Sequence, residues 1–221
     1  MTTNLVILGS GGVGRQTLQI ARDMNTREPT WNILGFLDDS SAAMGTTVAD
    51  FPVLGSSEWL REHDEVHVSV AIGSPADRKR ACDRLSSFHR SFATLIHPSA
   101  ILGDRCWIGE GATLYPGVVL DPDVQIGRFA LINKLCSVGH DTTVGSFVTL
   151  APGINVGGAV TIGDGCELGI GSATIQGVSI GEWSVIGAGG VVVRDVPPNV
   201  TAIGVPASPV KSRQQGWHEE A

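Results

Sequence analysis

A hydrophobic period of six residues runs through the second half of the sequence. Every sixth residue from Leu102 to Val192 gives sixteen positions, of which fifteen are aliphatic and only Thr174 departs. No helix or ordinary strand repeats every six residues, but a triangular coil does, because three six-residue sides close one coil. The period therefore predicts a prism of stacked short strands. Since no insertion interrupts it, no long loop should leave the prism.

Each repeat has a characteristic order of residue sizes. A small or β-branched residue stands two positions before the aliphatic one, and ten of the aliphatic residues are followed by glycine. We expect the aliphatic side chain to fill a corner of the core, the small residue to line a side, and the glycine to permit the bend. Cys106, Cys136 and Cys166 occupy the small-residue position. They should therefore be packed thiols rather than disulfide partners or metal ligands.

The first hundred residues alternate between strand and helix signals. Strands are predicted in NLVIL, WNILGFLDD and VHVSVAIGS, helices in RQTLQIARDM and in PADRKRACDRLSSF, and a short fourth strand in FATLIHPSA. This alternation is typical of a small parallel α/β sheet. We divide the chain into an α/β domain at residues 1–98, a coiled prism at residues 99–196, and a cap with a polar tail, loose or briefly helical, at residues 197–221.

The composition restricts the partners and the compartment. A formal net charge of −7 argues against a nucleic-acid partner, which needs a basic surface. No apolar span reaches membrane length and no basic-then-apolar leader opens the chain, so we expect a cytoplasmic protein with no membrane partner. The four cysteines are then expected to be free thiols.

A glycine-rich turn follows the first predicted strand. Gly9, Gly11 and Gly14 form a GxGxxG pattern, and Asp38 and Asp39 end the next predicted strand. Glycines at such a turn let the backbone approach a phosphate, and the helix N-terminus that follows favours an anion. Three interpretations stay open: a mononucleotide or nucleotide-sugar, NAD, or merely a tight turn. The domain lacks the second half of a dinucleotide fold, which favours the first interpretation.

His140 is the only histidine in the hexapeptide region. It stands two positions after Val138, at an expected bend, with Pro122 one coil below and Gly158 one coil above. A side chain at the bend should point outward, and Asp141 beside it can hold the imidazole tautomer and raise its basicity. The pair is either a general base with its carboxylate, or an exposed turn histidine followed by an ordinary turn aspartate.

The repeat resembles the left-handed β-helix of the hexapeptide-repeat acyltransferases. The FLDD, AIGS and LIHPSA segments, together with N-x6-H-[DE] leading to VGSF, are similar to one subfamily over nearly the whole chain, from Leu5 to about Lys211. It holds bacterial nucleotide-sugar N-acetyltransferases that act on UDP-4-amino-sugars or GDP-perosamine, and related sialic acid O-acetyltransferases. The resemblance implies a small parallel Rossmann-like sheet followed by a left-handed parallel β-helix, and an acetyltransferase that uses acetyl-CoA and no metal.

The resemblance also implies roles for individual residues. His140 matches the family's general base, and Asp141 matches the acidic residue that enhances it. The binding positions match Gly11, Gly12, Val13, Asp38, Asp39, Gly73 and Asn133 for the nucleotide-sugar, and Thr149, Gly158, Ile170 and Ala188 for acetyl-CoA. Gly158, stacked over His140 without a side chain, could also offer its N–H to the reaction's oxyanion. Some relatives carry histidine where Val13 and Thr149 stand, so the contacts there should differ.

Relatives complete their active sites with a neighbouring subunit. We therefore expect a homotrimer with acetyl-CoA in the groove between two prisms, and we expect exposed, fairly apolar sides with Phe129, Phe147 and Trp183 at bend positions. Acetylation of a sugar hydroxyl by the same base is the main alternative. A metal-bearing prism needs three histidine ligands across two subunits, whereas this repeat supplies one per chain. A non-catalytic binding protein and a small-molecule O-acetyltransferase also stay open, although the latter leaves the α/β domain unexplained.

Overall fold

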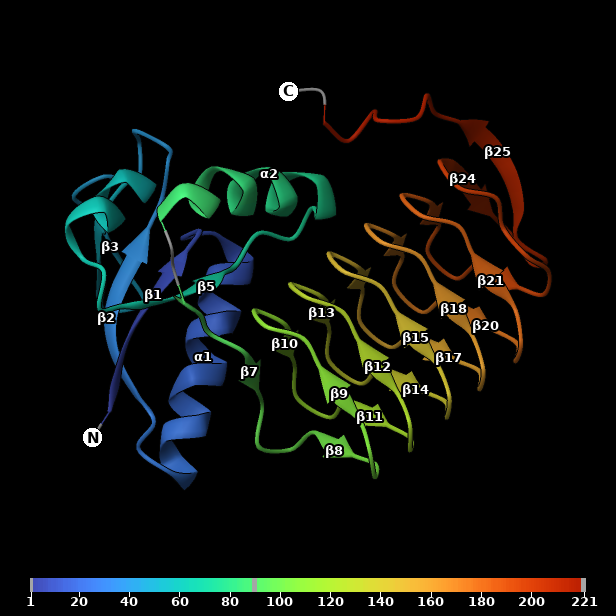
Figure 1. Ribbon diagram of the computed structural model, residues 1–221, viewed down its shortest axis with the longest axis horizontal. Helices are drawn as coiled ribbons and strands as arrows, with labels where there is room; N and C mark the ends of the chain where they lie inside the picture. Colours follow the sequence, from blue (N-terminus) through green and yellow to red (C-terminus); the bar gives the residue numbers. More distant parts are fainter. Residues whose placement is uncertain (1, 89–90, 220–221) are drawn as a thin grey trace.

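The computed structural model describes residues 2–88 and 91–219 and consists of an α/β sheet beside a long prism (Figure 1). The sheet has the order β3-β4-β2-β1-β5-β6 and is parallel except for the β3–β4 pair. Its strands are β1 (Thr3–Leu8), β2 (Trp31–Leu37), β3 (Thr47–Val48), β4 (Phe51–Gly55), β5 (His67–Val70) and β6 (Ser91–Phe92). Its helices are α1 (Gly12–Arg27) and α2 (Pro75–Leu85), with 3-10 turns at Ser57–Glu62 and Ser86–Phe88. The predicted parallel α/β sheet is confirmed, whereas β3, β4 and the first 3-10 turn were not predicted.

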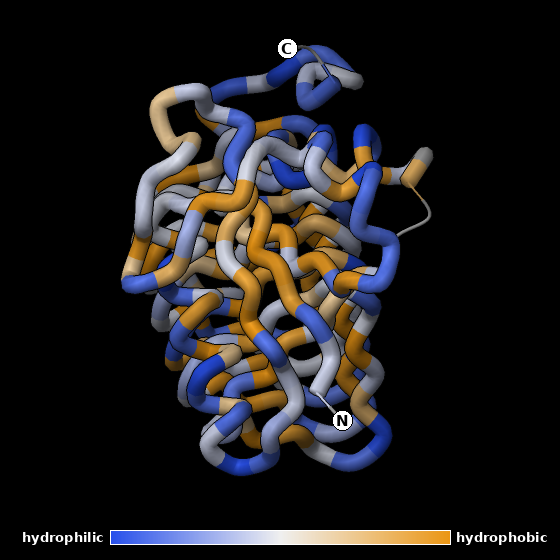
Figure 2. Tube along the Cα trace, turned by 90° about the vertical axis from the view of Figure 1, so that its left-hand side faces the viewer, coloured by the Kyte–Doolittle hydropathy of each residue, from blue (hydrophilic) through white to orange (hydrophobic). Residues whose placement is uncertain are grey.

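Strand β1 supplies both hydrophobic layers of this domain. Leu5 packs with Ile20 of α1, whereas Val6 and Leu8 pack with Leu85 of α2. Successive residues of a strand point to opposite faces, so α1 covers one face of the sheet and α2 the other. In Figure 2 the strands of this sheet face the viewer and are hydrophobic over most of their length.

The two helices begin differently. Ser74 caps α2, since its side chain accepts a hydrogen bond from the Asp77 N–H at 3.4 Å, and Pro75 stands in the first turn. Helix α1 follows Gly11, and no side chain caps it. The N-terminal N–H groups of α1 are therefore available to a ligand at the carboxyl end of the sheet.

The remaining chain winds into a triangular prism with three faces. The first face contains β7 (Leu95–Ile96), β10 (Thr113–Leu114), β13 (Leu131–Ile132), β16 (Thr149–Leu150), β19 (Glu167–Leu168), β22 (Val185–Ile186), β24 (Val200–Ile203) and β25 (Ser208–Ser212). The second contains β8 (Ile101–Leu102), β11 (Val119–Leu120), β14 (Ser137–Val138), β17 (Asn155–Val156), β20 (Ala173–Thr174) and β23 (Val191–Val192). The third contains β9 (Trp107–Ile108), β12 (Gln125–Ile126), β15 (Thr143–Val144), β18 (Thr161–Ile162) and β21 (Ser179–Ile180).

Residues that stack in successive coils are 18 positions apart. Ser137 pairs with Asn155 in register, and their side chains are hydrogen-bonded over this separation. The aliphatic residues of the six-residue period are buried from Leu114 onward. Leu102 and Ile108 of the first coil are only partly covered, because no coil lies beneath them on their faces. The predicted parallel β-helix of hexapeptide repeats is confirmed.

Two expectations about the repeat were wrong in detail. The aliphatic residue, such as Leu114, is the second residue of its strand and fills a flat side of the prism. The small residue, such as Ala112, follows the turn and fills the corner. The glycines after the aliphatic residues do not make the bend. A Cβ at Gly127 would lie 2.4 Å from the backbone of Gly145 in the coil above, so these glycines allow close stacking instead.

The bends use a different position, where φ is positive. Glycine occupies several of these positions, and the others carry side chains, among them Asp123 and Asp141 with φ of 64° and 58°. Aspartate tolerates this left-handed conformation better than most residues do. Asp141 therefore suits the bend sterically as well as chemically.

The prism begins earlier than the expected boundary at residue 98. Leu95–Ile96 pairs with Thr113–Leu114 in the first face, whereas Ser91–Phe92 pairs with β5 as the sixth strand of the α/β sheet. The single strand predicted in FATLIHPSA is thus two strands that belong to different sheets. Within residues 2–88 and 91–219, no helix combines the length and the hydrophobicity that crossing a membrane requires.

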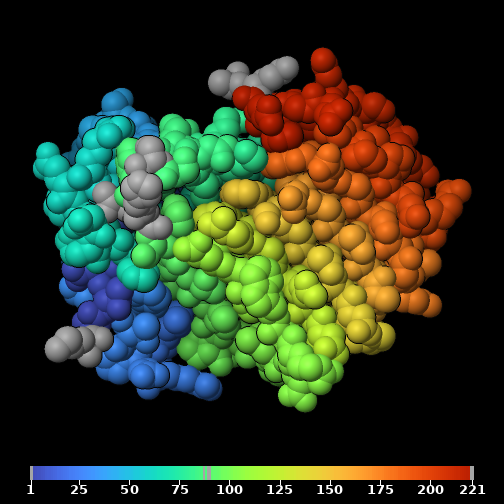
Figure 3. All heavy atoms as spheres, in the orientation of Figure 1, coloured from blue at the N-terminus to red at the C-terminus, as the bar shows by residue number. Residues whose placement is uncertain are grey.

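The aromatic residues expected on exposed sides lie under other parts of this chain. Phe129 and Phe147 stack on each other and join the hydrophobic cluster beneath α2. Trp183 stacks on His218, because the C-terminal segment folds back over the prism after the β24–β25 cap (Figure 3). The tail was expected to be loose or briefly helical, but as far as Glu219 it forms turns packed on Trp183.

Candidate active site

His140 and Asp141 form the turn between the second and third faces, which we call the second–third corner (residues 121–123, 139–141 and 157–159 in successive coils). His140 Nδ1 lies 2.7 Å from Asp141 Oδ2, and the two side chains are 65% and 63% exposed. The hydrogen bond and the charge of Asp141 raise the pKa of His140 above its ordinary value, with a smaller contribution from Asp121. With the Nδ1 proton held by Asp141, Nε2 is the ring nitrogen left to accept a proton.

Gly158 lies directly over the imidazole. A Cβ at position 158 would lie 2.7 Å from His140 Nε2, so the ring occupies the space that a side chain there would need. Across residues 2–88 and 91–219, no acceptor is recorded for the Gly158 N–H. A backbone N–H that no protein group accepts is suited to bind developing negative charge.

The coil below holds the turn in place. Arg105 forms a two-pronged ion pair with Asp123, which stands one coil under Asp141. The Asp141 N–H donates to the Pro122 carbonyl at 3.2 Å, and the His140 carbonyl accepts from the Ala159 N–H at 2.7 Å. Both sides of the His140–Asp141 turn are thus tied to neighbouring coils, which fixes the backbone under the exposed imidazole.

A second group of predicted residues surrounds the glycine loop of the α/β domain. Gly9 has φ of 107°, and a Cβ at Gly14 would lie 2.0 Å from the Gly9 carbonyl oxygen, so these two glycines serve the fold. Gly11 and Gly12 are exposed, and no heavy atom lies within 4 Å of a Cβ built on either. Neither has positive φ, so neither conformation nor packing of the chain requires glycine there. This openness is what close approach of a ligand to the backbone would need.

Asp38 and Asp39 border the same loop. Asp38 accepts hydrogen bonds from the Ser10 N–H at 2.9 Å, from the Ser10 hydroxyl, and from the Ser40 N–H at 3.0 Å. Burial acts to raise the pKa of Asp38, but these hydrogen bonds outweigh it and lower the pKa below its ordinary value. Asp39 accepts from the Ser57 N–H at 2.8 Å and pairs with Arg84 at 3.1 Å.

A cavity of about 310 Å³ opens where β1, β2 and β5 end. Its lining contains both predicted aspartates and two arginines of α2. The lining residues are Leu8, Gly9, Asp38, Asp39, Ile72, Asp77, Arg80 and Arg84. Crevices at the carboxyl ends of parallel strands are the usual ligand sites of such sheets. Sequence reasoning missed Arg80 and Arg84. Their four-residue spacing in the predicted helix was the available signal, because it places both on one helix face.

The remaining predicted residues lie in three places. Gly73 is beside the loop, where a Cβ would lie 3.4 Å from Val13, and its carbonyl accepts a hydrogen bond from the Thr149 hydroxyl at 3.0 Å. Thr149 therefore contacts the α/β domain and has no hydroxyl proton left for another acceptor. The turn between the first and second faces, the first–second corner, carries Asn133, Ile170 and Ala188, with Ile170 two coils after Asn133 and Ala188 one coil after Ile170.

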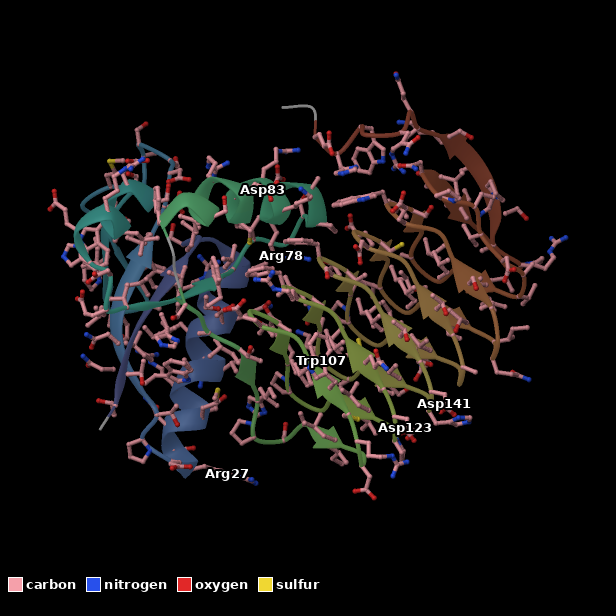
Figure 4. All side chains as sticks on the ribbon, viewed as in Figure 1. Arg27, Arg78, Asp83, Trp107, Asp123 and Asp141 are labelled. Carbon is pink, nitrogen blue, oxygen red and sulfur yellow. The ribbon has the colours of Figure 1, made fainter. Side chains whose placement is uncertain are left out.

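The structure assembles two groups and does not join them. His140, Asp141 and Gly158 meet at the second–third corner, whereas Asp38 and Asp39 line the cavity and Gly11 and Gly12 belong to the glycine loop that Asp38 borders. Figure 4 shows Asp141 and Asp123 at an edge of the prism that points away from the α/β domain. Throughout the described chain, the recorded hydrogen bonds of the His140 side chain go to Asp141 alone.

Comparison with known proteins gives matches on both parts. Residues 4–85 match the family described as the PglD N-terminal domain. A GDP-perosamine N-acetyltransferase of Escherichia coli is 34% identical over 124 residues, 55% of each chain, and a UDP-N-acetylbacillosamine N-acetyltransferase of Bacillus subtilis is 34% identical over 113 residues, 50% of each. The chain thus aligns with about half the length of these two curated relatives.

A solved structure extends the likeness to nearly the full length. It is a histidine-to-asparagine variant of perosamine N-acetyltransferase from Caulobacter crescentus in complex with CoA and GDP-perosamine. The identity is 32%, the TM-score is 0.87, and the overlap covers 96% of this chain and 99% of that chain. All three of these proteins are named N-acetyltransferases, which transfer an acetyl group to nitrogen. Their names do not favour the alternative of a sugar O-acetyltransferase.

Proposed function

Because this chain belongs to the bacterial nucleotide-sugar N-acetyltransferases of the hexapeptide-repeat superfamily, we propose that it moves the acetyl group of acetyl-CoA to the amino group of a nucleotide-linked amino-sugar. The observation that carries the proposal is the exposed His140, oriented by Asp141 at 2.7 Å and lying against Gly158. An exposed turn histidine without function would need neither the carboxylate nor the glycine above it.

The proposed reaction needs one base and one oxyanion donor. The amine lone pair attacks the thioester carbonyl carbon while His140 Nε2 takes the proton that the nitrogen loses. The tetrahedral oxyanion accepts from the Gly158 N–H, and Asp141 stabilises the imidazolium through Nδ1. Collapse breaks the carbon–sulfur bond, and the proton passes from Nε2 to the CoA thiolate. A base with a raised pKa suits this step, because it binds the amine proton more firmly.

The cavity of the α/β domain is the proposed nucleotide-sugar site. Open backbone at Gly11 and Gly12, the uncapped start of α1, and two arginines of α2 suit a diphosphate, whereas the carboxylate oxygens of Asp38 and Asp39 suit hydroxyl or base N–H groups. Val13 and Gly73 would border the sugar end. The same proposal divides the chain by function: the α/β domain before β7 binds the nucleotide-sugar, the prism from Leu95 onward transfers the acetyl group, and residues 197–221 form the cap and tail.

We propose a homotrimer whose active sites lie between subunits. This is supported by the separation of His140 from the cavity within one chain, since a neighbour's prism can supply the base. Acetyl-CoA would then lie along the groove between two prisms, against Gly158 on one corner and the 63% exposed Ile170 with Ala188 on another. Asn133 would donate its side-chain amide to the sugar, and Thr149 would contact CoA only as an acceptor.

The enzyme is proposed to work in the cytoplasm. Its four cysteines are all free thiols, and burial raises the pKa of Cys136 to about 11 and that of Cys166 to about 12. Free, unreactive thiols are typical of a reducing compartment.

The test is a substrate screen on the purified protein. We would incubate it with acetyl-CoA and UDP- or GDP-linked amino-sugars, follow free thiol release, and identify the acetylated sugar by mass and by the amide it contains. Thiol release that depends on one amino-sugar and on His140 is the expected result. Release without an acceptor, or equal rates in His140→Ala, would reject the assignment.

A further inference from the structure

One arginine is completely buried where the α/β domain meets the prism. Arg78 of α2 has an exposed fraction of 0% and is the bulkiest fully buried side chain of the described residues. Figure 4 shows it between the end of the sheet and the first coils. Its five N–H groups have acceptors on both parts: the carbonyls of Ile72 (2.6 Å), Gly73 (3.0 Å), Phe129 (2.8 Å), Phe147 (2.7 Å) and Val148 (3.3 Å), and the Thr149 hydroxyl (3.0 Å).

No carboxylate neutralises this guanidinium. Across residues 2–88 and 91–219, none lies within ion-pair distance of it. Burial lowers the pKa of Arg78 to about 10, so the group stays charged at neutral pH. A buried charge is costly unless all its donors are satisfied, and an apolar residue of similar volume would fill this space at lower cost. Packing alone therefore does not account for an arginine here.

The acceptors of Arg78 belong to two separate structures. Ile72 lines the proposed nucleotide cavity and Gly73 follows it, while Phe129 and Phe147 stand one coil apart at the corner between the third and first faces. The Thr149 hydroxyl adds a second bridge, because it accepts from Arg78 and donates to the Gly73 carbonyl. A planar guanidinium holds its acceptors in fixed directions, which an ammonium does not.

We propose that Arg78, with Thr149, is a positioning residue that fixes the wall of the nucleotide cavity relative to the prism. The inference rests on the proposed function: a sugar held in the cavity reaches a base on a prism only if the two parts keep one orientation. A displacement of about 1 Å in such an arrangement can lower the rate of a reaction by about 100-fold. Loss of the bridge should therefore lower kcat and leave nucleotide affinity nearly unchanged.

Substitutions of Thr149 give the cleanest test, because they leave Arg78 and the cavity in place. Thr149→Val should lower kcat by about 10-fold, with the dissociation constant for the free nucleotide within about twofold of wild type. Thr149→Ser should restore kcat, because the hydroxyl returns. Thr161→Val is the matched control, since Thr161 holds the same strand position on the exposed third face. Equal kcat in both valine variants, or a higher KM for acetyl-CoA with unchanged kcat, would overturn the proposal.

Arg78→Lys tests the same bridge from the other side. It keeps the charge, loses the planar fork, and should lower kcat by about 100-fold while hydrogen exchange accelerates in both Ile72–Gly73 and Phe147–Thr149. Faster exchange in only one of these segments would contradict the bridge. The exchange measurement needs no turnover. If the wild type acetylates no amino-sugar, the proposed function fails on its own while this result still decides whether Arg78 couples the two parts.

Discussion

His140 and Gly158 stand one coil apart, and the imidazole of the first occupies the space where a side chain of the second would begin. The distance from His140 Nε2 to a Cβ built at 158 is 2.7 Å, shorter than any ordinary contact. The pose of the candidate base therefore depends on a residue 18 positions away in the sequence.

Gly158→Ala tests that dependence. The methyl group must push the ring away, so we expect kcat to fall by about 100-fold while the assembly and the KM for the nucleotide-sugar stay near wild type. Gln176→Ala, one coil higher in the same column, should have little effect. Steady-state kinetics measures this. Turnover of Gly158→Ala close to that of Gln176→Ala would show that the ring does not need its present position.

The proposed catalytic pair His140–Asp141 should set the acid limb of the pH–rate profile. A general base works unprotonated, so the rate should fall as the pH drops below the raised pKa of His140. Asp141→Asn removes the hydrogen bond to an anion and the charge, which lowers that pKa and moves the acid limb to lower pH. We also expect a plateau about 10-fold lower. His140→Ala and His140→Asn should each lower kcat by about two to four orders of magnitude. A limb that moves to higher pH in Asp141→Asn would contradict the assignment.

Asp38 should affect the nucleotide-sugar and not acetyl-CoA. Asp38→Asn keeps the shape and loses the charge, so the dissociation constant for the nucleotide-sugar should rise by about 10-fold, measured by calorimetry. Asp50→Asn, in an exposed loop, is the control. UDP or GDP should also raise the thermal midpoint of the wild type by linkage, whereas NAD should not. A larger rise of the thermal midpoint with NAD than with UDP or GDP would favour the interpretation of the cavity as a dinucleotide site.

The proposed sharing of active sites between subunits predicts complementation between inactive chains. Gly12→Trp should obstruct the proposed phosphate-binding loop, where the space beside Gly12 is open, and His140→Ala removes the base. Co-refolded at equal amounts, the two chains should regain about a quarter of wild-type activity, because a site then draws each intact half from a different subunit. Light scattering should give about three times 23.1 kDa. Absence of regained activity in a confirmed mixed trimer would place each site within one chain.

The prism could be predicted because each of its positions repeats. Thr174, the one break in the period, is buried like the aliphatic residues, and its hydroxyl accepts a hydrogen bond from the Gly157 N–H at 3.0 Å. His140 could be placed at a bend for the same reason. The role of each glycine could not be predicted, because a bend with positive φ and close stacking of coils both favour glycine. Only the coordinates distinguish these two roles.

Contacts between segments far apart in the chain could not be predicted from the sequence. Arg78 lies in a polar helix where an exposed side chain is the ordinary expectation, and its acceptors on the prism are backbone carbonyls that no residue identity reveals. Phe129 and Trp183 were expected on open surface for a related reason. Periodicity describes the prism alone and says nothing about the helix or the tail that comes to cover it.

Because the register is unbroken, equivalent positions along the prism axis recur once per coil. A side chain at a corner can be moved along the axis only in steps of about 4.8 Å, because a shift of any other size places it on a different face or turns it inward. Loss of one residue within the stack would therefore misplace every group beyond it, whereas gain or loss of a complete coil would leave each corner pointing as before. Divergence of such a chain toward longer or shorter substrates is expected to proceed in these fixed increments.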